Sequence, residues 1–271
     1  MTGMGPSTMI GEASTSRVGG LAVHAWGKGA PLVLVHGGMG SWRHWIRNIG
    51  ALSATYSVLA LEMPGCGDSD SVARDIPDDD YIALVERAVD TIGGPRPFRL
   101  AGFSFGGVIS ALVAARMGSR IRKLSLVSPG GFGRSPRALD LRTIPPDSAG
   151  METVREVLRH NLRVMMLANP SSITEETLDI HHANVRRTRF DGRRFSLGNR
   201  MAETLPRIAC PIQTVWGELD ALPYPNVQAR IDICRAAVPG IRVDLIPGAG
   251  HWVQYEAPDG VNRALLDFFA A

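Results

Sequence analysis

Short apolar runs alternate along most of the chain with longer segments of helical periodicity. Runs bounded by glycine or proline predict strands at residues 21–24, 32–35, 57–61, 98–101, 123–127, 212–215 and 242–246. Apolar positions with helical spacing predict helices over 78–92, from about 105, over 227–238 and over 257–269. Strands that alternate with helices of this length form parallel sheets covered by helices. The predicted fold class is therefore α/β, with a mostly parallel central sheet flanked by helices.

Two segments depart from this alternation. Residues 133–205 contain no strand-like run, but they do contain helical patterns at 151–167 and 174–189. We interpret them as a helical cap inserted in a core formed by residues 18–132 and 206–271. Residues 1–17 lack a basic start followed by an apolar run, so a secretory signal is not indicated and a disordered tail is expected.

Composition narrows the classes of partner. The net charge of the 271 residues is only +3, without the long basic runs of a nucleic-acid-binding arm. No apolar tract is long enough to span a bilayer, so no membrane partner is expected. Three widely spaced cysteines fit neither a disulfide framework nor a zinc site, and they favour reduced thiols in a cytoplasm. The expected partner is a small-molecule substrate, with no metal or organic cofactor; the oligomeric state stays open, a homodimer included.

A serine stands among glycines where a strand pattern gives way to a helix pattern. Gly102-Phe103-Ser104-Phe105-Gly106 has the form G-x-S-x-G, and Gly107 follows. A strand that turns into a helix within about one residue strains the residue at the apex, and side chains two positions away would collide with the chain. The motif therefore predicts that Ser104 lies above the edge of the sheet, at the start of a helix.

A serine hydroxyl is a weak nucleophile and needs a base, which in turn needs a group that holds it. His251 follows the strand predicted at 242–246, and Asp220 follows the strand predicted at 212–215. The chain order of serine, acid and histidine suits a sheet of this kind. We therefore expect Ser104, Asp220 and His251 to converge as a catalytic triad, with Glu218 as the alternative acid.

Acyl transfer also needs two N–H donors for the negatively charged oxygen of the tetrahedral intermediate. The amide of Phe105 directly follows the nucleophile, and the loop His36-Gly37-Gly38-Met39-Gly40 follows an early strand. We expect the oxyanion hole to consist of the Phe105 and Gly38 amides. His36 is expected to brace this loop rather than to take part in the chemistry.

The motifs LVLVHGG, EMPGCGDSD, GFSFGG, VWGELD and GAGHWVQYE occur in this order and spacing. As a set they resemble the α/β-hydrolase superfamily over about residues 20–271. Within it the chain is most similar to the meta-cleavage-product hydrolases, which split carbon–carbon bonds in ring-opened aromatic catabolites. That likeness extends to SPGGFG, to SSITEETL and to the tryptophan directly after the catalytic histidine, here Trp252. The resemblance implies a serine hydrolase with a helical cap.

Two positions depart from those carbon–carbon hydrolases. They carry Asn where this chain has Phe103, and Arg where it has His181; both family residues contact the dienoate substrate. The departures favour a small, largely apolar carboxylic ester as substrate, with the ring-opened dienoate as the alternative. Two rivals of other classes are a non-catalytic ligand-binding receptor and a cofactor-free lyase or oxygenase on the same fold.

Several side chains adjoin the proposed catalytic groups or stand at the family's contact positions. The candidate substrate contacts are Met39, Phe103, Phe105, His181 and Trp252. As residues of a cap helix, His181 and His182 are otherwise expected to be exposed. The arginine-rich run at 185–194 is expected to form a solvated face, with contact to an acidic substrate as the alternative.

Overall fold

The computed structural model describes residues 11–270, and its centre is a sheet of eight strands in the order β1-β2-β4-β3-β5-β6-β7-β8. The strands are β1 (Ser14–Val18), β2 (Leu21–Trp26), β3 (Ala30–Val35), β4 (Tyr56–Leu61), β5 (Phe98–Phe103), β6 (Ile121–Val127), β7 (Ile212–Gly217) and β8 (Arg242–Ile246). β2 pairs with both β1 and β4 in antiparallel fashion, and every other neighbouring pair is parallel. The predicted α/β class with a mostly parallel sheet is confirmed.

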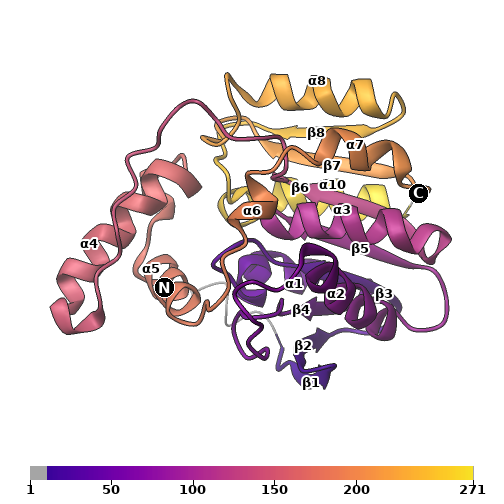
Figure 1. Cartoon of the computed structure of the whole chain (residues 1–271), viewed down its shortest axis with the longest axis horizontal. Helices are drawn as coiled ribbons and strands as arrows, with labels where there is room; N and C mark the ends of the chain where they lie inside the picture. The colour runs from indigo at the N-terminus through magenta and orange to yellow at the C-terminus, as the bar shows by residue number, and fades with distance from the viewer. Residues whose placement is uncertain (1–10, 271) are drawn as a thin grey trace.

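Helices cover both faces of this sheet (Figure 1). Leu32 and Leu34 of β3 face the core that contains α1 (Ile46–Ser53) and α10 (Pro258–Ala270). Val33 and Val35 face the opposite core, which contains α2 (Asp78–Gly93) and α3 (Phe105–Met117). A strand covered on both faces needs an unbroken apolar run, and each such buried side chain stabilises the fold by about 2 kcal/mol. α8 (Val227–Ala237) packs beside β7.

Residues 133–205, called the cap segment below, are helical where they are regular. They contain α4 (Met151–Asn161), a π-helical segment (Leu162–Met166), α5 (Glu175–Arg186), α6 (Arg193–Ser196) and α7 (Met201–Thr204). Figure 1 shows α4 and α5 to one side of the sheet. The helix predicted over 151–167 changes to π-helical geometry after Asn161, and α5 begins at a capping box on Thr174.

The prediction of a disordered tail over residues 1–17 is wrong for its last residues, because β1 begins at Ser14. Residues 1–10 lie outside the described residues, whereas β1 pairs along its whole length with β2. Its sequence STSRV is exposed at four of five positions, so it carries no apolar alternation that could indicate a strand. Within residues 11–270, no helix is both long and apolar enough to cross a bilayer.

Candidate active site

Ser104 lies at the junction of β5 and α3 in a backbone conformation that L-residues rarely adopt, with φ 52° and ψ −114°. Glycines make this turn possible. A Cβ at Gly102 would lie 2.4 Å from the Gly106 carbonyl oxygen, and a Cβ at Gly106 would lie 2.3 Å from the His36 carbonyl oxygen. The collisions expected from the sequence are therefore present, and both involve main-chain atoms that cannot easily move away.

Three of the proposed catalytic side chains meet in one hydrogen-bonded row. His251 Nε2 lies 2.9 Å from Ser104 Oγ, and His251 Nδ1 lies 2.8 Å from Asp220 Oδ2. His251 is 2% exposed and Asp220 6% exposed, so water screens their contact little. The other oxygen, Asp220 Oδ1, accepts from the Leu222 amide at 2.9 Å. Glu218, the alternative acid, instead accepts from the Gly248 amide at 3.0 Å.

The two amides proposed for the oxyanion hole lie close together. A Cβ at Gly38 would lie 3.7 Å from the Phe105 Cβ, so the loop after β3 contacts the start of α3. Phe105 is the first residue of α3, where a backbone N–H has no acceptor within the helix. Across residues 11–270, neither amide donates a hydrogen bond to the protein. Both donors are therefore available to a ligand.

His36 braces the loop that carries Gly38. Its Nε2 accepts from the Met63 amide at 3.0 Å, so its Nδ1 carries the proton and donates to the Gly37 carbonyl oxygen at 2.7 Å. Burial lowers the pKa of His36, which keeps the ring neutral and stable in this arrangement. This geometry agrees with the bracing role expected from the sequence.

A second buried histidine, His44, lies beneath the proposed site. Its Nδ1 accepts from the Gly37 amide at 3.1 Å, and its ring packs edge-on against Phe103 with centroids 5.3 Å apart. Burial is the main reason why its pKa falls well below the usual value; the neighbouring His36, His181 and His251 add to the effect. Sequence reasoning missed His44, because nothing in SWRHW separates it from an ordinary helix residue.

His181 is buried, although it was expected to be exposed. Thr177, His181 and Asn184 share one face of α5, and all three are buried. Thr177 Oγ1 lies 2.8 Å from the Tyr255 hydroxyl, and Asn184 Oδ1 accepts from Ser41 Oγ at 2.7 Å. His181 Nδ1, between them, has no hydrogen-bond partner in the described part of the chain. Burial lowers the pKa of His181 to about 4, so the ring is neutral at pH 7.

The remaining candidate substrate contacts differ in how far they are exposed. Met39 is 44% exposed beside Gly38. Phe103 and Trp252 have no exposed surface; Phe103 packs against His251 with ring centroids 5.2 Å apart, and Trp252 donates to the His44 carbonyl oxygen at 2.9 Å. In this structure Phe103 supports His251, Trp252 packs against His44 and Tyr255, and neither ring lines open space. Phe105 is also buried, against Tyr81 and two phenylalanines of the cap segment.

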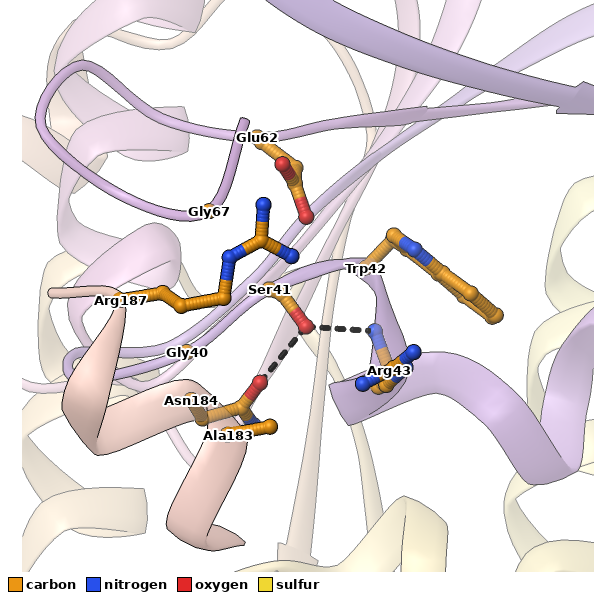
Figure 2. Close-up of a pocket in the computed structure, with 9 residues that line it drawn as sticks. All are labelled: Gly40, Ser41, Trp42, Arg43, Glu62, Gly67, Ala183, Asn184 and Arg187. Carbon is orange, nitrogen blue, oxygen red and sulfur yellow. Dashed lines mark hydrogen bonds between the residues drawn. The ribbon is translucent and has the colours of Figure 1, made fainter. Parts of the chain in front are cut away.

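A small cavity of about 10 Å³ lies where α5 meets the core. Ser41, Glu62, Asn184 and Arg187 are among its lining residues, and Figure 2 shows the Ser41 hydroxyl pointing to the Asn184 amide. This volume suffices for about one water molecule. The cavity is therefore too small to be a substrate pocket.

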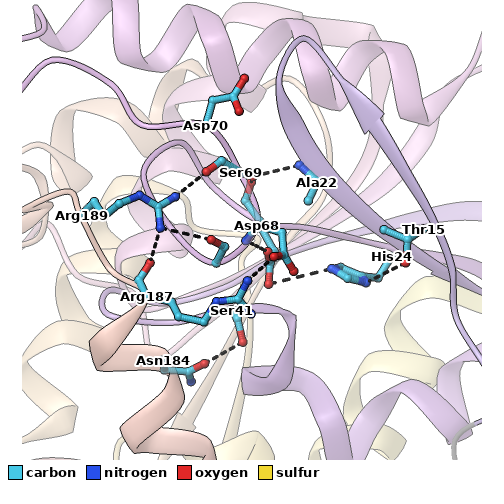
Figure 3. Close-up of polar contacts among 12 residues, drawn as sticks. Thr15, Ala22, His24, Ser41, Asp68, Ser69, Asp70, Asn184, Arg187 and Arg189 are labelled. Carbon is cyan, nitrogen blue, oxygen red and sulfur yellow. Dashed lines mark hydrogen bonds and ion pairs between the residues drawn. The ribbon is translucent and has the colours of Figure 1, made fainter. Parts of the chain in front are cut away.

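The five arginines of the run at 185–194 are exposed as expected, whereas Phe190 within it is buried. Some of the guanidinium groups also bind the core (Figure 3). Arg187 pairs with Asp68, and Arg189 donates to the carbonyl oxygens of Gly67 and Ser69. His24, Glu62 and Asp68 also place possible metal-ligating atoms within 4.8 Å of one another. Arg187 already supplies a positive charge to Asp68, and this ion pair joins the cap segment to the core.

Comparison with known proteins gives the class to which this arrangement belongs. The chain matches the model of the Alpha/beta hydrolase family over residues 32–264, and it belongs to that family. It is an α/β-fold hydrolase, as its relatives and its fold together show.

Two relatives and one solved structure illustrate the likeness. The chain is 30% identical to a 2-hydroxy-6-oxo-6-phenylhexa-2,4-dienoate hydrolase of Burkholderia cepacia, over 90% of this chain and 89% of that protein. It is 31% identical to the dihydrolipoyllysine-residue acetyltransferase component of the acetoin cleaving system of Pseudomonas putida, over 89% of this chain but only 63% of that protein. The naproxen esterase of Bacillus subtilis superimposes with a TM-score of 0.76 at 20% identity, covering 97% of this chain and 94% of the esterase, which shows a shared fold.

Proposed function

We propose that this hydrolase cleaves small, largely apolar carboxylic esters through an acyl-enzyme on Ser104. The observation that carries the proposal is the single imidazole that contacts both Ser104 Oγ, at 2.9 Å, and Asp220 Oδ2, at 2.8 Å. A nucleophile, a base and a group that orients the base are the three parts that acyl transfer requires.

The chemistry follows from these contacts. His251 Nε2 takes the proton of Ser104 as Oγ attacks the ester carbonyl carbon, and Asp220 stabilises the imidazolium that forms. The amides of Gly38 and Phe105 donate to the negatively charged oxygen, each contributing about 3 kcal/mol to the transition state. His251 then gives its proton to the departing alcohol. Water, activated by the same imidazole, attacks the acyl-enzyme and releases the acid and free Ser104.

The surroundings of the row favour an uncharged substrate. Phe103 and Trp252 are apolar supports, and His44 and His181 are neutral at pH 7 because burial lowers their pKa values. A substrate carboxylate would therefore find no cation in these two imidazoles. Likeness to the Burkholderia cepacia enzyme favours a second candidate, hydrolysis of a ring-opened dienoate at a carbon–carbon bond by the same triad.

Hydrolysis of p-nitrophenyl butyrate by the Ser104→Ala variant tests the main proposal. Loss of the nucleophile should reduce kcat by a factor of roughly 10³ to 10⁶. Ser110→Ala is a matched control, because Ser110 is a buried serine on the same helix whose hydroxyl makes no hydrogen bond among the described residues. Full activity of Ser104→Ala would contradict the mechanism.

Two further assays separate the candidates. A fluorophosphonate probe should label only the peptide that contains Ser104, and labelling should disappear in Ser104→Ala and persist in Ser110→Ala. A ring-opened dienoate should keep its visible absorbance in the presence of the enzyme. Its rapid bleaching, at a rate exceeding that of ester hydrolysis, would instead favour the carbon–carbon hydrolase.

A further inference from the structure

Glu256, at the end of α9 (Val253–Glu256), accepts hydrogen bonds from two segments that are far apart in the chain. Its Oε2 accepts from the Gly250 amide at 2.6 Å and from the Ala168 amide at 3.1 Å. Its Oε1 accepts from the Asn169 amide at 2.6 Å. Gly250 directly precedes His251, whereas Ala168 and Asn169 belong to the cap segment, just after the π-helical segment.

A second contact joins the same two segments on the other side of His251. The Trp252 amide donates to the Met166 carbonyl oxygen at 2.8 Å. A Cβ at Gly250 would lie 2.7 Å from the Ala168 nitrogen, so the two main chains touch there without room for a side chain. Both neighbours of His251 are therefore attached to residues 166–169.

We propose that Glu256 is a positioning residue that joins the cap segment to the His251 loop, so that the imidazole is correctly oriented only while the cap is in place. The proposal rests on the proposed role of His251 as the base. A carboxylate suits this position because each of its oxygens accepts, and hydrogen bonds to an ionised acceptor are about twice as strong as neutral ones. Displacement of residues 166–169 would pull on Gly250 and Trp252 together and turn the ring between them.

The variant Glu256→Gln keeps the shape of the side chain and replaces one accepting oxygen with an NH₂ group. At least one of the three amides then faces another donor, and the buried loop loses a charged acceptor. Hydrogen exchange should therefore accelerate by about tenfold in both peptides 165–170 and 248–253. The kcat for p-nitrophenyl butyrate should fall by about tenfold while KM changes less than about twofold, because a misoriented base slows the chemical step.

Glu218→Gln is the matched control. Glu218 also accepts from an amide of the His251 loop, that of Gly248, but it makes no hydrogen bond to the cap segment. Its replacement should accelerate exchange near Gly248 and leave peptide 165–170 unchanged. A purely structural role of Glu256 would lower the melting temperature and accelerate exchange in both peptides without the change in kcat.

Several results would overturn the proposal: acceleration of exchange in only one of the two peptides, or an unchanged kcat in folded Glu256→Gln. If Glu256→Gln does not fold, Glu256→Asp keeps the charge but shortens the reach by one methylene, and the same paired changes are expected of it. If the unaltered enzyme neither hydrolyses esters nor reacts with a fluorophosphonate, the proposed function fails. The exchange measurements then still test whether Glu256 connects residues 166–169 to the His251 loop.

Discussion

The replacement Asp220→Asn tests the triad at its most buried hydrogen bond. The Asp220 carboxylate uses both oxygens: Oδ1 accepts from the Leu222 amide at 2.9 Å, and Oδ2 accepts from His251 Nδ1 at 2.8 Å. Asparagine offers one oxygen and one NH₂ group in the same space. It can therefore satisfy only one of these two donors.

Each orientation of the new amide has a cost. If its oxygen stays on Leu222, its NH₂ group faces His251 Nδ1, and the ring must carry its proton on Nε2, where it cannot accept from Ser104. If the amide turns over, the buried Leu222 N–H loses its acceptor at a cost of about 1–3 kcal/mol, which reduces the competent population by roughly 5- to 150-fold. The imidazolium also loses its neighbouring negative charge, so kcat should fall by about 10³-fold in total.

The assay is hydrolysis of p-nitrophenyl butyrate, with circular dichroism to show that the variant is folded. Glu218→Gln serves as comparison because Glu218 is exposed and accepts from the Gly248 amide rather than from His251. Its activity should stay within about threefold of the parent. If Asp220→Asn retains more than a tenth of the activity while Glu218→Gln abolishes it, the assignment of the acid is wrong.

Three further predictions concern the surroundings of the site. Because the pKa of His181 is about 4 in the folded chain against 6.5 in the unfolded one, stability should decline by about 1.4 kcal/mol per unit as the pH falls from 6.5 to about 4. Urea unfolding at neutral and at acidic pH should show a smaller decline for His181→Gln. Gly106→Ala places a Cβ 2.3 Å from the His36 carbonyl oxygen and should destabilise the fold by about 3 kcal/mol in urea titrations. Burial raises the pKa of Cys66 and of Cys234 to about 12, so neither thiol should react with iodoacetamide near pH 7.5 until the chain unfolds.

The sequence predicts most of the fold because most of its strands contain a short apolar run. β3 is an unbroken apolar run, since both of its faces are buried, and every strand predicted from such a run is present. β1 was missed because an exposed edge strand needs no apolar pattern; it is held by main-chain pairing with β2. α1 was missed for a different reason: it has only eight residues, its buried face of Ile46, Ile49 and Leu52 also contains the polar Asn48, and Gly50 lies in its middle.

Within the site, local sequence predicts the residues that local geometry demands. Ser104 needs its flanking glycines, and these form a recognisable motif. Asp220 and His251 lie in the loops directly after β7 and β8, so their positions in the sequence are enough to identify them as candidates. His44 and Glu256 gave no such sign. The importance of Glu256 comes from contacts across more than 80 residues of chain, such as the bond from the Asn169 amide. The importance of His44 comes from its contacts with the Gly37 amide and the Phe103 ring. Such contacts depend on how separate segments pack together in the fold, which no local pattern encodes.

The position of α5 shows where substrate choice can vary without harm to the triad. Before this helix, residues 166–169 are held by Glu256 and by the Trp252 amide; after it, Arg187 and Arg189 bind the loop after β4. These attachments use main-chain groups of residues 166–169 and the side chains of the arginines that follow α5. The attachments therefore do not depend on the buried side chain at position 181. A substitution at position 181 changes the polarity or charge next to His44, while α5 stays in place. Under the proposed mechanism, in which Ser104, His251 and Asp220 transfer the acyl group, His181 should therefore govern which acyl group is accepted.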